Sequence, residues 1–221
     1  MNDQNTNGLR KADVFDVFAE VTKAMANGRR LELLELMAQG EHSVEDLANL
    51  TGMGMTTTSA HLQSLKRAGL VQTRRRRTTI FYRLAADDVA ELYTAAKRVA
   101  LARNSRLRDT VQAYMSEPRA EGPTIDPAAV TSDMLVVDVR PKDEFDSAHF
   151  PGAISIPLAE LEDRYTEIPA EAEVVLYCRG EFCRLSREAA VWLRERGLDA
   201  KSMDEGIVEW RATKEIALDA T

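Results

Sequence analysis

Cys178 and Cys183 are the two cysteines of this 221-residue chain, and they lie five positions apart. The apolar run Val174–Tyr177 ends at Cys178, a polar turn with Gly180 follows, and an amphipathic pattern begins at Arg184. This order predicts a buried strand, a tight loop and the N-terminus of a helix. Backbone N–H groups and the positive end of a helix dipole favour a thiolate over a thiol. We therefore expect Cys178 to be a nucleophile.

The same loop is also a candidate anion-binding site, because we expect its backbone N–H groups and its two arginines to point towards a bound anion. The alternative interpretation is that Cys178 is a small hydrophobic residue buried at the end of a strand. Cys183 could act as a resolving thiol that forms a bridge with Cys178, or could simply pack at the start of the helix. A bridge requires Cα atoms within roughly 7 Å of each other. The predicted anion cradle comprises Arg179, Gly180, Glu181, Phe182, Cys183 and Arg184.

Length and composition favour two domains of about 100 residues each. No stretch approaches the 18 or so apolar residues of a membrane span, and the first ten residues contain no apolar signal region. Two cysteines do not make a disulfide framework, so we expect a cytoplasmic protein without a membrane partner.

The net charge of −7 is divided unevenly along the chain. Residues 1–116 carry 17 Lys and Arg against 13 Asp and Glu, whereas the remaining residues carry 12 against 23. A mildly basic half joined to a strongly acidic half indicates two different tasks.

The first half contains a helix-turn-helix pattern. After a polar tail over residues 1–10, which we expect to be disordered, helical spacing predicts helices over 11–25, 29–38, 45–50 and 55–68. The glycine turn between the last two is typical of a helix-turn-helix. The inward face of the fourth helix comprises Met55, Thr58, Leu62 and Leu65.

The outward face of that helix is a candidate for contacts in a DNA major groove. It is small and polar, and no Asp or Glu occurs from residue 53 to residue 86. The alternative is an ordinary solvated face. The candidate DNA contacts on this helix are Thr56, Thr57, Ser59, His61, Gln63, Ser64 and Arg67.

Two β-prone runs flank four consecutive arginines and predict a hairpin with a basic tip. Such a tip would bind phosphates or enter the minor groove, although a run of charge is often only a solvated turn. The arginines are Arg74, Arg75, Arg76 and Arg77.

The run Ser59–Val71, followed by this arginine hairpin and Tyr82–Leu84, resembles the ArsR-type winged-helix repressors over residues 11–115. The resemblance implies binding to double-stranded operator DNA by a homodimer built on the first helix and a long last helix, expected over residues 85–115. Metal-sensing members carry cysteines at the start of the third helix. Because residues 42–47 contain none, we expect neither a metal nor a cofactor.

The second half reads as an α/β domain. A polar linker is expected over 116–125 and the domain over 126–221. Apolar strands over 134–140, 153–156, 174–177 and 200–203 alternate with helical segments. This alternation predicts a parallel sheet covered by helices, with the working loops at the carboxyl ends of its strands. The fold class is thus a mainly-α winged helix followed by an α/β domain.

Five motifs in order, Val137–Arg140, Ala148–Ala153, Ile156-Pro157, the Cys178 loop and Asp204–Gly206, resemble the rhodanese domain. The resemblance implies that Cys178 accepts a sulfane sulfur as a persulfide, with Asp138, Arg140 and Glu144 in the charged scaffold around the catalytic loop. Two features depart from it. Glu205 replaces the first glycine of the late Gly-Gly motif, and the interval from Cys178 to Gly197 is slightly longer than in single-domain rhodaneses. As Cys-x5-Arg with Arg184 as its last member, the loop instead resembles that of the related phosphatases and arsenate reductases.

These resemblances together predict a transcriptional regulator, of the repressor type, whose second domain senses a small sulfur donor or a thiol-directed oxyanion through Cys178. The alternative is an enzyme, a sulfurtransferase or an arsenate reductase or phosphatase, that carries a DNA-binding domain. The sequence leaves the effector, the operator and catalytic turnover undecided.

Overall fold

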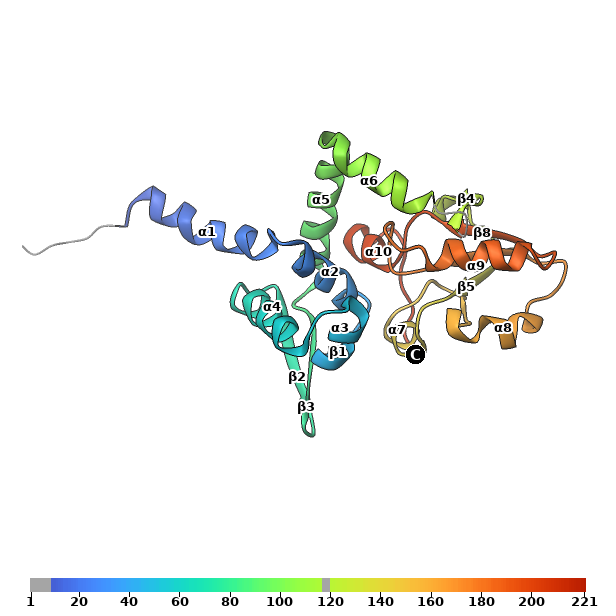
Figure 1. The fold of residues 1–221 in the computed structure, drawn as a ribbon, viewed down its shortest axis with the longest axis horizontal. Coiled ribbons are helices and arrows are strands. Elements are labelled where there is room, and N and C mark those ends of the chain that lie inside the picture. The colour runs from blue at the N-terminus through green and yellow to red at the C-terminus, as the bar shows by residue number, and fades with distance from the viewer. Residues whose placement is uncertain (1–8, 117–119) are drawn as a thin grey trace, which may run out of the picture.

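The computed structural model describes residues 9–116 and 120–221, which form two units lying against each other (Figure 1). Residues 1–8 of the expected tail and 117–119 of the expected linker lie outside the described residues. Within the part that is described, no helix is long and apolar enough to cross a membrane.

The first unit is the predicted winged helix-turn-helix. The turn into the third helix is set by Ser43, whose hydroxyl accepts a hydrogen bond from the Asp46 backbone N–H at 3.1 Å while Asp46 accepts in return. Gly52 ends that helix with a φ of 66°, which favours glycine. The elements are α1 Lys11–Met25, α2 Gly28–Met37, β1 His42–Ser43, α3 Val44–Thr51, α4 Met55–Arg67, β2 Val71–Arg76, β3 Thr79–Leu84, α5 Asp87–Arg103 and α6 Ser105–Met115.

The hairpin is longer than the sequence predicts, so three of the four arginines lie in a strand rather than at its tip. Arg74 pairs with Phe81 and Arg76 with Thr79 across the β2–β3 ladder. The turn lies at residues 77–78, where Arg77 has a φ of 54°. Because side chains alternate along a strand, Arg74 and Arg76 point to one face and Arg75 to the other.

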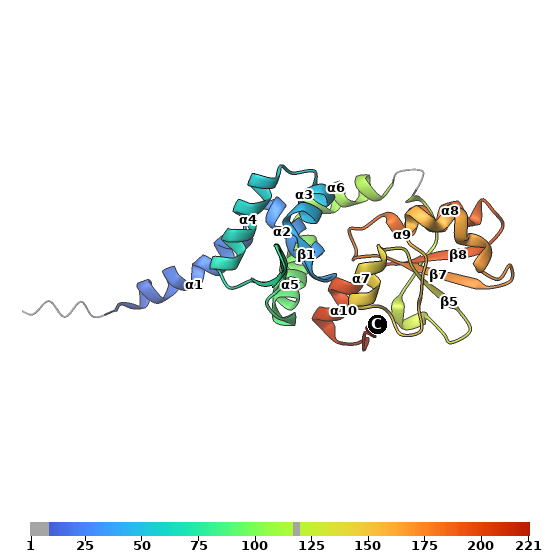
Figure 2. The same ribbon diagram turned by 90° about the horizontal axis from the view of Figure 1, so that it is seen from below.

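The single long helix expected over residues 85–115 is wrong. It breaks at Asn104, whose extended backbone ends α5 and whose side chain accepts a hydrogen bond from the Leu107 N–H as the N-cap of α6. An asparagine followed by a serine favours such a cap over helix continuation. The break lets α6 turn towards the second unit (Figures 1 and 2).

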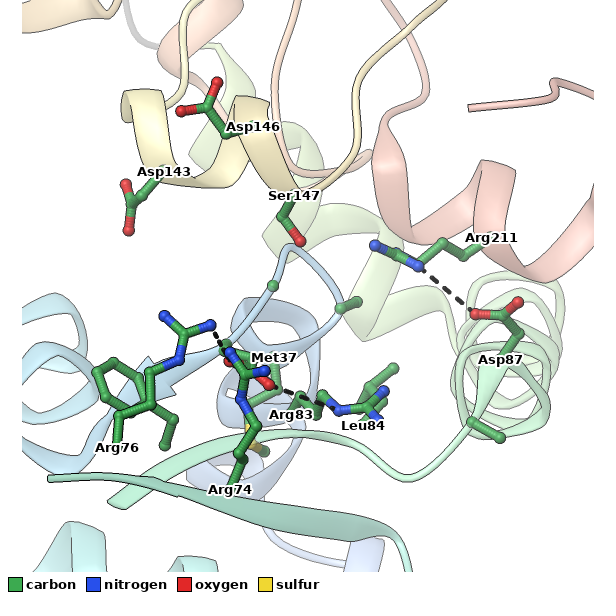
Figure 3. A pocket seen from close by; sticks show the side chains of 15 residues that line it. Met37, Arg74, Arg76, Arg83, Leu84, Asp87, Asp143, Asp146, Ser147 and Arg211 are labelled. Carbon is green, nitrogen blue, oxygen red and sulfur yellow. Dashed lines mark hydrogen bonds and ion pairs between the residues drawn. The ribbon is translucent and has the colours of Figure 1, made fainter. Parts of the chain in front are cut away.

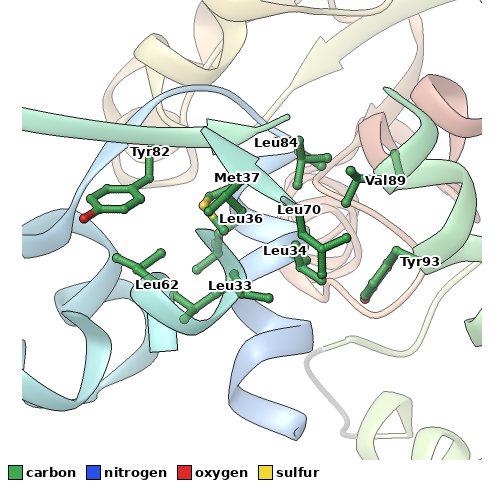
Figure 4. Packing of buried hydrophobic residues seen from close by; sticks show 14 of the residues in the cluster. Leu33, Leu34, Leu36, Met37, Leu62, Leu70, Tyr82, Leu84, Val89 and Tyr93 are labelled. Carbon is green, nitrogen blue, oxygen red and sulfur yellow. The ribbon is translucent and has the colours of Figure 1, made fainter. Parts of the chain in front are cut away.

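The core of the first unit packs α2, α4 and α5 against the hairpin (Figure 4). Thr58, Leu62 and Leu65 are buried as predicted, whereas Met55, in the first turn of α4, is 52% exposed and does not join the core. The principal apolar members of the core are Leu33, Leu34, Leu36, Met37, Leu62, Leu70, Tyr82, Leu84, Val89 and Tyr93.

The second unit is built on a five-stranded parallel sheet with the order β4-β8-β7-β5-β6. Its strands are β4 Thr124–Ile125, β5 Leu135–Asp138, β6 Ile154–Ser155, β7 Glu173–Tyr177 and β8 Asp199–Met203. Its helices are α7 Lys142–Ser147, α8 Leu161–Arg164, α9 Leu185–Arg194 and α10 Ile207–Thr213, with 3-10 turns at Pro127–Ala129, Leu158–Glu160 and Tyr165–Glu167. Thr124 and Ile125, expected in the linker, pair with Ser202 and Met203 at the sheet edge.

Successive strand residues face opposite sides, and each side has its own apolar cluster. Leu176 packs with α8 and α9 on one side. Val175 and Tyr177 pack with α10 on the other. The predicted parallel sheet with helices on both faces is therefore confirmed.

Helix α10 belongs to the cores of both units. Ile207 and Trp210 pack against the sheet, whereas Val208 lies in the buried core of the winged helix and Ala212 packs against that core. Helices α10 and α5 lie against each other in both views (Figures 1 and 2). The winged-helix core is therefore completed by a residue that lies more than 100 positions away in the sequence.

We expect Val208→Ala to lower the free energy of unfolding by about 1–3 kcal/mol, because it opens a void in this shared core. Chemical denaturation followed by tryptophan fluorescence and by circular dichroism measures the change. Ile80→Ala is the control, since it removes more carbon from a side chain that is 46% exposed. An equal or smaller loss for Val208→Ala would contradict this assignment of the core.

Candidate functional site

The loop between β7 and α9 places the two cysteines next to each other, at the carboxyl end of a central strand. Cys178 follows Tyr177, and the loop curls so that the Cys183 N–H donates to the Gly180 carbonyl at 2.9 Å. The Cα atoms of Cys178 and Cys183 are 6.3 Å apart, and the two sulfurs form a disulfide. The structure therefore represents the oxidised form of the cysteine pair.

The two sulfurs differ in their surroundings. Cys178 is 2% exposed and belongs to the apolar cluster beneath α9. Cys183 is only partly buried and lines a cavity. The nucleophilic thiolate expected at Cys178 is thus not the state seen here, because its sulfur is bonded to that of Cys183 and the residue is buried.

The two loop arginines have partners other than the cysteines. Arg179 forms a two-pronged ion pair with Glu144 of α7, its Nη2 lying 2.6 Å from Oε1. Arg184 donates to the Tyr114 carbonyl at 3.2 Å, and its guanidinium lies 4.2 Å from the centre of the Tyr114 ring. Residues 179–184, expected to form an anion cradle, are therefore folded around the disulfide. The guanidinium of Arg179 is directed to the Glu144 carboxylate and that of Arg184 to α6.

Asp138 and Arg140 form a fully buried ion pair behind the loop, with Arg140 Nη2 at 2.6 Å from Asp138 Oδ2. Tyr177 also donates its hydroxyl to Asp138, at 2.6 Å. Burial acts to lower the pKa of Arg140, but the Asp138 carboxylate more than offsets it and the pKa is raised. The remaining hydrogen bonds of Arg140 go to Gln39 and to the Ala148 carbonyl, so this pair supports the loop from behind.

Gln39, at the end of α2, connects this scaffold with the winged helix. Its side chain is fully buried; its oxygen accepts from Arg140 Nη1 at 3.0 Å and its nitrogen donates to the Arg179 carbonyl at 3.2 Å. The same Arg179 carbonyl accepts the Val208 N–H of α10 at 3.1 Å. One peptide group of the cysteine loop is thereby held by an element of each unit.

Glycines allow α10 to lie directly on the loop. A side chain at Gly206 would overlap the Cys178 carbonyl and would come 2.6 Å from the Gly180 nitrogen. A side chain at Gly180 would come 2.7 Å from Val208 Cγ1. The disulfide loop and the N-terminus of α10 are therefore packed backbone against backbone.

Lys97 of α5 forms a second connection across the units. Its ammonium pairs with Glu209 of α10 and with Glu181 of the loop, the latter at 3.2 Å, and lies 5.0 Å from the centre of the Phe182 ring. Burial acts to lower the pKa of Lys97, but Glu209 and Glu181 outweigh it and raise the pKa. A buried charge of this kind is costly to separate from its partners.

Sequence reasoning missed Gln39, Lys97 and Tyr114 as contacts of the loop. A signal existed for Lys97, because it follows Val89 and Tyr93 at four-residue spacing and thus lies on the buried face of its helix. Gln39 carries no such signal. Tyr114 belongs to the last helix, which the sequence predicts to form the dimer interface, whereas its ring stacks on Arg184.

The candidate DNA-binding residues of α4 are mostly accessible. Thr56, Thr57, Gln63 and Arg67 are exposed, and Ser59, His61 and Ser64 are partly buried. Gln63 Nε2 donates to the Tyr82 hydroxyl at 3.0 Å, and Ser64 accepts from Arg30 Nη1 at 3.0 Å. These two bonds fix side chains on the outward face of α4.

The arginines of the hairpin divide between two environments. Arg74 and Arg76 each pair with Glu41, at 3.1 and 2.9 Å, and Arg83 lies 3.8 Å from it. They project into a cavity of about 700 Å³ between the hairpin and α7 (Figure 3). The helix across this cavity presents Asp143, Asp146 and Ser147, as Figure 3 shows. Arg75 lies on the opposite face, and its Nε donates to the Arg77 carbonyl at 2.9 Å.

Comparisons with known proteins agree with the two halves. Residues 27–73 match the model of the bacterial regulatory proteins of the arsR family, and residues 126–213 match the rhodanese-like domain. The HTH-type transcriptional regulator Rv0324 of Mycobacterium tuberculosis is 42% identical over 207 residues, covering 91% of this chain and 90% of that protein.

Other relatives match the first half alone. The transcriptional activator HlyU of Vibrio cholerae is 38% identical over 77 residues, which is 35% of this chain and 71% of that protein. A solved homodimeric winged helix-turn-helix domain of Mb0332 from Mycobacterium bovis is 48% identical, covers 48% of this chain and 95% of that one, and has a TM-score of 0.41.

The two units meet where Gln39 and Lys97 contact the cysteine loop, and this contact region is called the seam. Glu35 of α2 lies beside the seam. Burial raises the pKa of its carboxyl from the ordinary 4.5 to about 7. Nearby charges act in both directions: the cations Lys97 and Arg179 lower the pKa, whereas the carboxylates Glu209 and Glu32 raise it. Glu35 therefore takes up a proton on folding over part of the pH range.

Between pH 4.5 and about 7, folded Glu35 holds a proton that the unfolded chain has lost, so the free energy of unfolding falls as pH rises. Glu35→Gln removes this dependence. We expect its stability relative to wild type to improve by up to about 3 kcal/mol between pH 4 and pH 8. Urea denaturation at both pH values measures the change, with Glu45→Gln, at an exposed position of α3, as control. Parallel profiles for wild type and Glu35→Gln would contradict the assignment.

Proposed function

The chain belongs to the ArsR family of transcriptional regulators and carries a C-terminal rhodanese-like domain, and we propose that sulfur chemistry at Cys178 controls its affinity for operator DNA. The effector is a reactive sulfur species, such as a persulfide, that converts the cysteine pair between dithiol and disulfide. The observation that carries this proposal is the double hydrogen bond to the Arg179 carbonyl, from Gln39 of the winged helix and from Val208 of α10.

The chemistry of the switch is a two-step oxidation. A thiolate of the pair accepts the sulfane sulfur of a persulfide and releases a thiolate of the donor. The second thiolate then attacks the inner sulfur of the new persulfide, closes the disulfide and expels hydrosulfide. No further oxidant is required, because the sulfane sulfur is reduced as the two cysteines are oxidised.

The disulfide acts on the DNA-binding half through the loop. The bridge holds the two Cα atoms at 6.3 Å, and two thiols or a persulfide lack that constraint. A shift of the loop changes the contacts of Gln39, Lys97 and Tyr114, which lie at the end of α2, on α5 and on α6, respectively. These residues belong to the unit that contains α4 and the hairpin. Its contacts with the loop therefore depend on the state of the cysteine pair.

DNA binding is assigned to the exposed residues of α4 and to the hairpin. The polar, carboxylate-free surface of α4 suits a major groove, and Arg75 and Arg77 lie at the exposed end of the hairpin. Arg74 and Arg76 are engaged with Glu41 and would have to exchange this carboxylate for phosphate.

A homodimer is supported by the apolar surface of α1, which extends away from the rest of the molecule (Figure 1). Val14, Phe15, Val17 and Phe18 are each more than half exposed. Such a contiguous surface is typical of an interface, and a two-fold dimer would pair two recognition helices. On α5, Val89 and Tyr93 are used in the monomer core, so α1 has the larger share of the proposed interface.

The rival function, that of a sulfurtransferase, an arsenate reductase or a phosphatase, has less support. Cys178 is 2% exposed, and Arg179 and Arg184 are directed to Glu144 and Tyr114. Turnover would require repeated access of a substrate to that sulfur. The geometry favours a slow switch over a catalytic cycle.

Fluorescence anisotropy with labelled upstream DNA of the gene tests the proposal. We expect a persulfide donor to change the Kd of the reduced wild-type protein by about tenfold or more, corresponding to a coupling of roughly 1.4 kcal/mol. Cys178→Ser should show the same Kd with and without donor, because it cannot close the bridge.

Cys183→Ser is the matched variant, and it should likewise lose the response while retaining DNA binding. A response of wild type and both variants by the same factor would contradict the proposal. So would identical Kd values for fully reduced and fully oxidised wild-type protein.

We expect Glu41→Gln to bind DNA several-fold more tightly at low salt and with a steeper salt dependence, because Arg74 and Arg76 become free for phosphates. Glu45→Gln is the control, since it removes the same charge from an exposed position of α3. Equal affinities and equal salt slopes for the two variants would mean that Glu41 does not compete with DNA.

A further inference from the structure

A cavity of about 240 Å³ lies in the seam between the two units, on one side of the disulfide. Its walls come from α2 and α3, from Tyr114 of α6, and from the loop and α9 of the second unit. Of the two cysteines, Cys183 lines it and Cys178 does not. The cavity therefore presents one particular sulfur of the bridge.

Cys178 is enclosed by protein and has almost no contact with solvent. Its sulfur lies in the apolar cluster of β7 and α9, with 2% of the residue exposed, and Gly206 lies against its carbonyl. A thiolate attacks a disulfide in line with the S–S bond, so the sulfur that is reached becomes bonded and the other one leaves. Access from this cavity reaches Cys183 and expels Cys178.

We infer that the cavity is the binding site of an amino-acid-sized, zwitterionic thiol or persulfide, and that sulfur exchange takes place at Cys183 with Cys178 as the leaving thiolate. This inference rests on the proposed switch and assigns its two sulfurs different roles. Cys183 is the residue that meets the small molecule, and Cys178 closes or opens the bridge from inside.

The opening reaction is balanced in two steps. The thiolate RS⁻ bonds to Cys183 Sγ, the S–S bond breaks, and its electron pair leaves on Cys178 as a thiolate. A second RS⁻ then attacks the R-side sulfur of the mixed disulfide, releases RSSR and leaves Cys183 as a thiolate. The bridge gains two electrons, and two molecules of thiol are oxidised.

The class of ligand follows from the size and charges of the walls. The cavity is smaller than the roughly 300–1,000 Å³ of pockets for drug-sized molecules, so it suits a molecule of amino-acid size. Glu32 and Glu188 line the cavity and are paired with Arg29 and Arg184. The ammonium group of a ligand would exchange with these partners, and Arg184 would then pair with the carboxylate of the ligand. Glu35 Oε1 is buried there and has no hydrogen-bond partner among the described residues, so it is available to a ligand donor.

Single-cysteine variants test which sulfur reacts, because in them a mixed disulfide cannot move to a neighbour. Full-length Cys178→Ser and Cys183→Ser proteins are incubated with cystine, quenched in acid and followed by mass spectrometry. We expect the cysteine adduct to form about tenfold or more faster in Cys178→Ser, whose remaining thiol is Cys183. Equal rates, or faster reaction of Cys178, would overturn the inference.

A cavity-filling variant provides a second test in the protein with both cysteines. Leu50→Trp places a large ring at the α3 wall, and Ala159→Trp is the matched control because it adds the same ring at an exposed position of another cavity. We expect free cysteine to open the disulfide about tenfold more slowly in Leu50→Trp and at the wild-type rate in Ala159→Trp. Equal rates in the two variants would exclude this cavity as the route.

DNA affinity measured on the same samples separates this inference from the proposed function. If Cys183 reacts first but the Kd for DNA does not follow the redox state, the site assignment holds and the regulatory function fails. If the Kd follows the redox state while Cys178 reacts first, the regulatory function holds and the assignment of Cys183 fails.

Discussion

The Lys97 ammonium is buried between Glu209 and Glu181, and this enclosed charge constrains how the two halves of the protein can move. Separating this ammonium from both carboxylates would leave an uncompensated charge in a poorly solvated place, which typically costs several kcal/mol. Helix α5 of the winged helix therefore stays with α10 and with the cysteine loop. Gln39 adds a fully buried hydrogen-bonded bridge to the same loop. The halves form one mechanical unit with the disulfide at its seam.

This arrangement gives regulation a physical basis. Interfaces with buried polar partners have a few discrete arrangements and do not deform continuously, so a change in the loop selects between them. The loop backbone lies directly on α10, whose Val208 is part of the winged-helix core. The S–S bond therefore lies close to the core side chains whose packing positions α4 and the hairpin. Glu35, with a pKa raised by burial to about 7, makes the same seam sensitive to pH.

Much of the fold is predictable from local pattern, whereas the seam is not. Periodicity, the Ser43 cap and the apolar strands identify the winged helix and the parallel sheet. The break at Asn104 depends on one cap that competes with a continuous apolar stripe, and the strand position of Arg74 and Arg76 depends on register. The roles of Gln39 and Tyr114 arise from docking of the two halves. Single-domain patterns carry no information on that docking.

Amide hydrogen exchange, compared between the disulfide and dithiol forms of the full-length protein, tests the central claim most directly. The account predicts that reduction increases exchange beyond the loop, in α10 and in the Tyr93–Lys97 turns of α5, because the contacts of Glu181, Glu209 and Arg179 loosen together. An increase confined to residues 178–185, with unchanged protection in α5 and α10, would contradict it. In that case the cysteine pair would be uncoupled from the DNA-binding half.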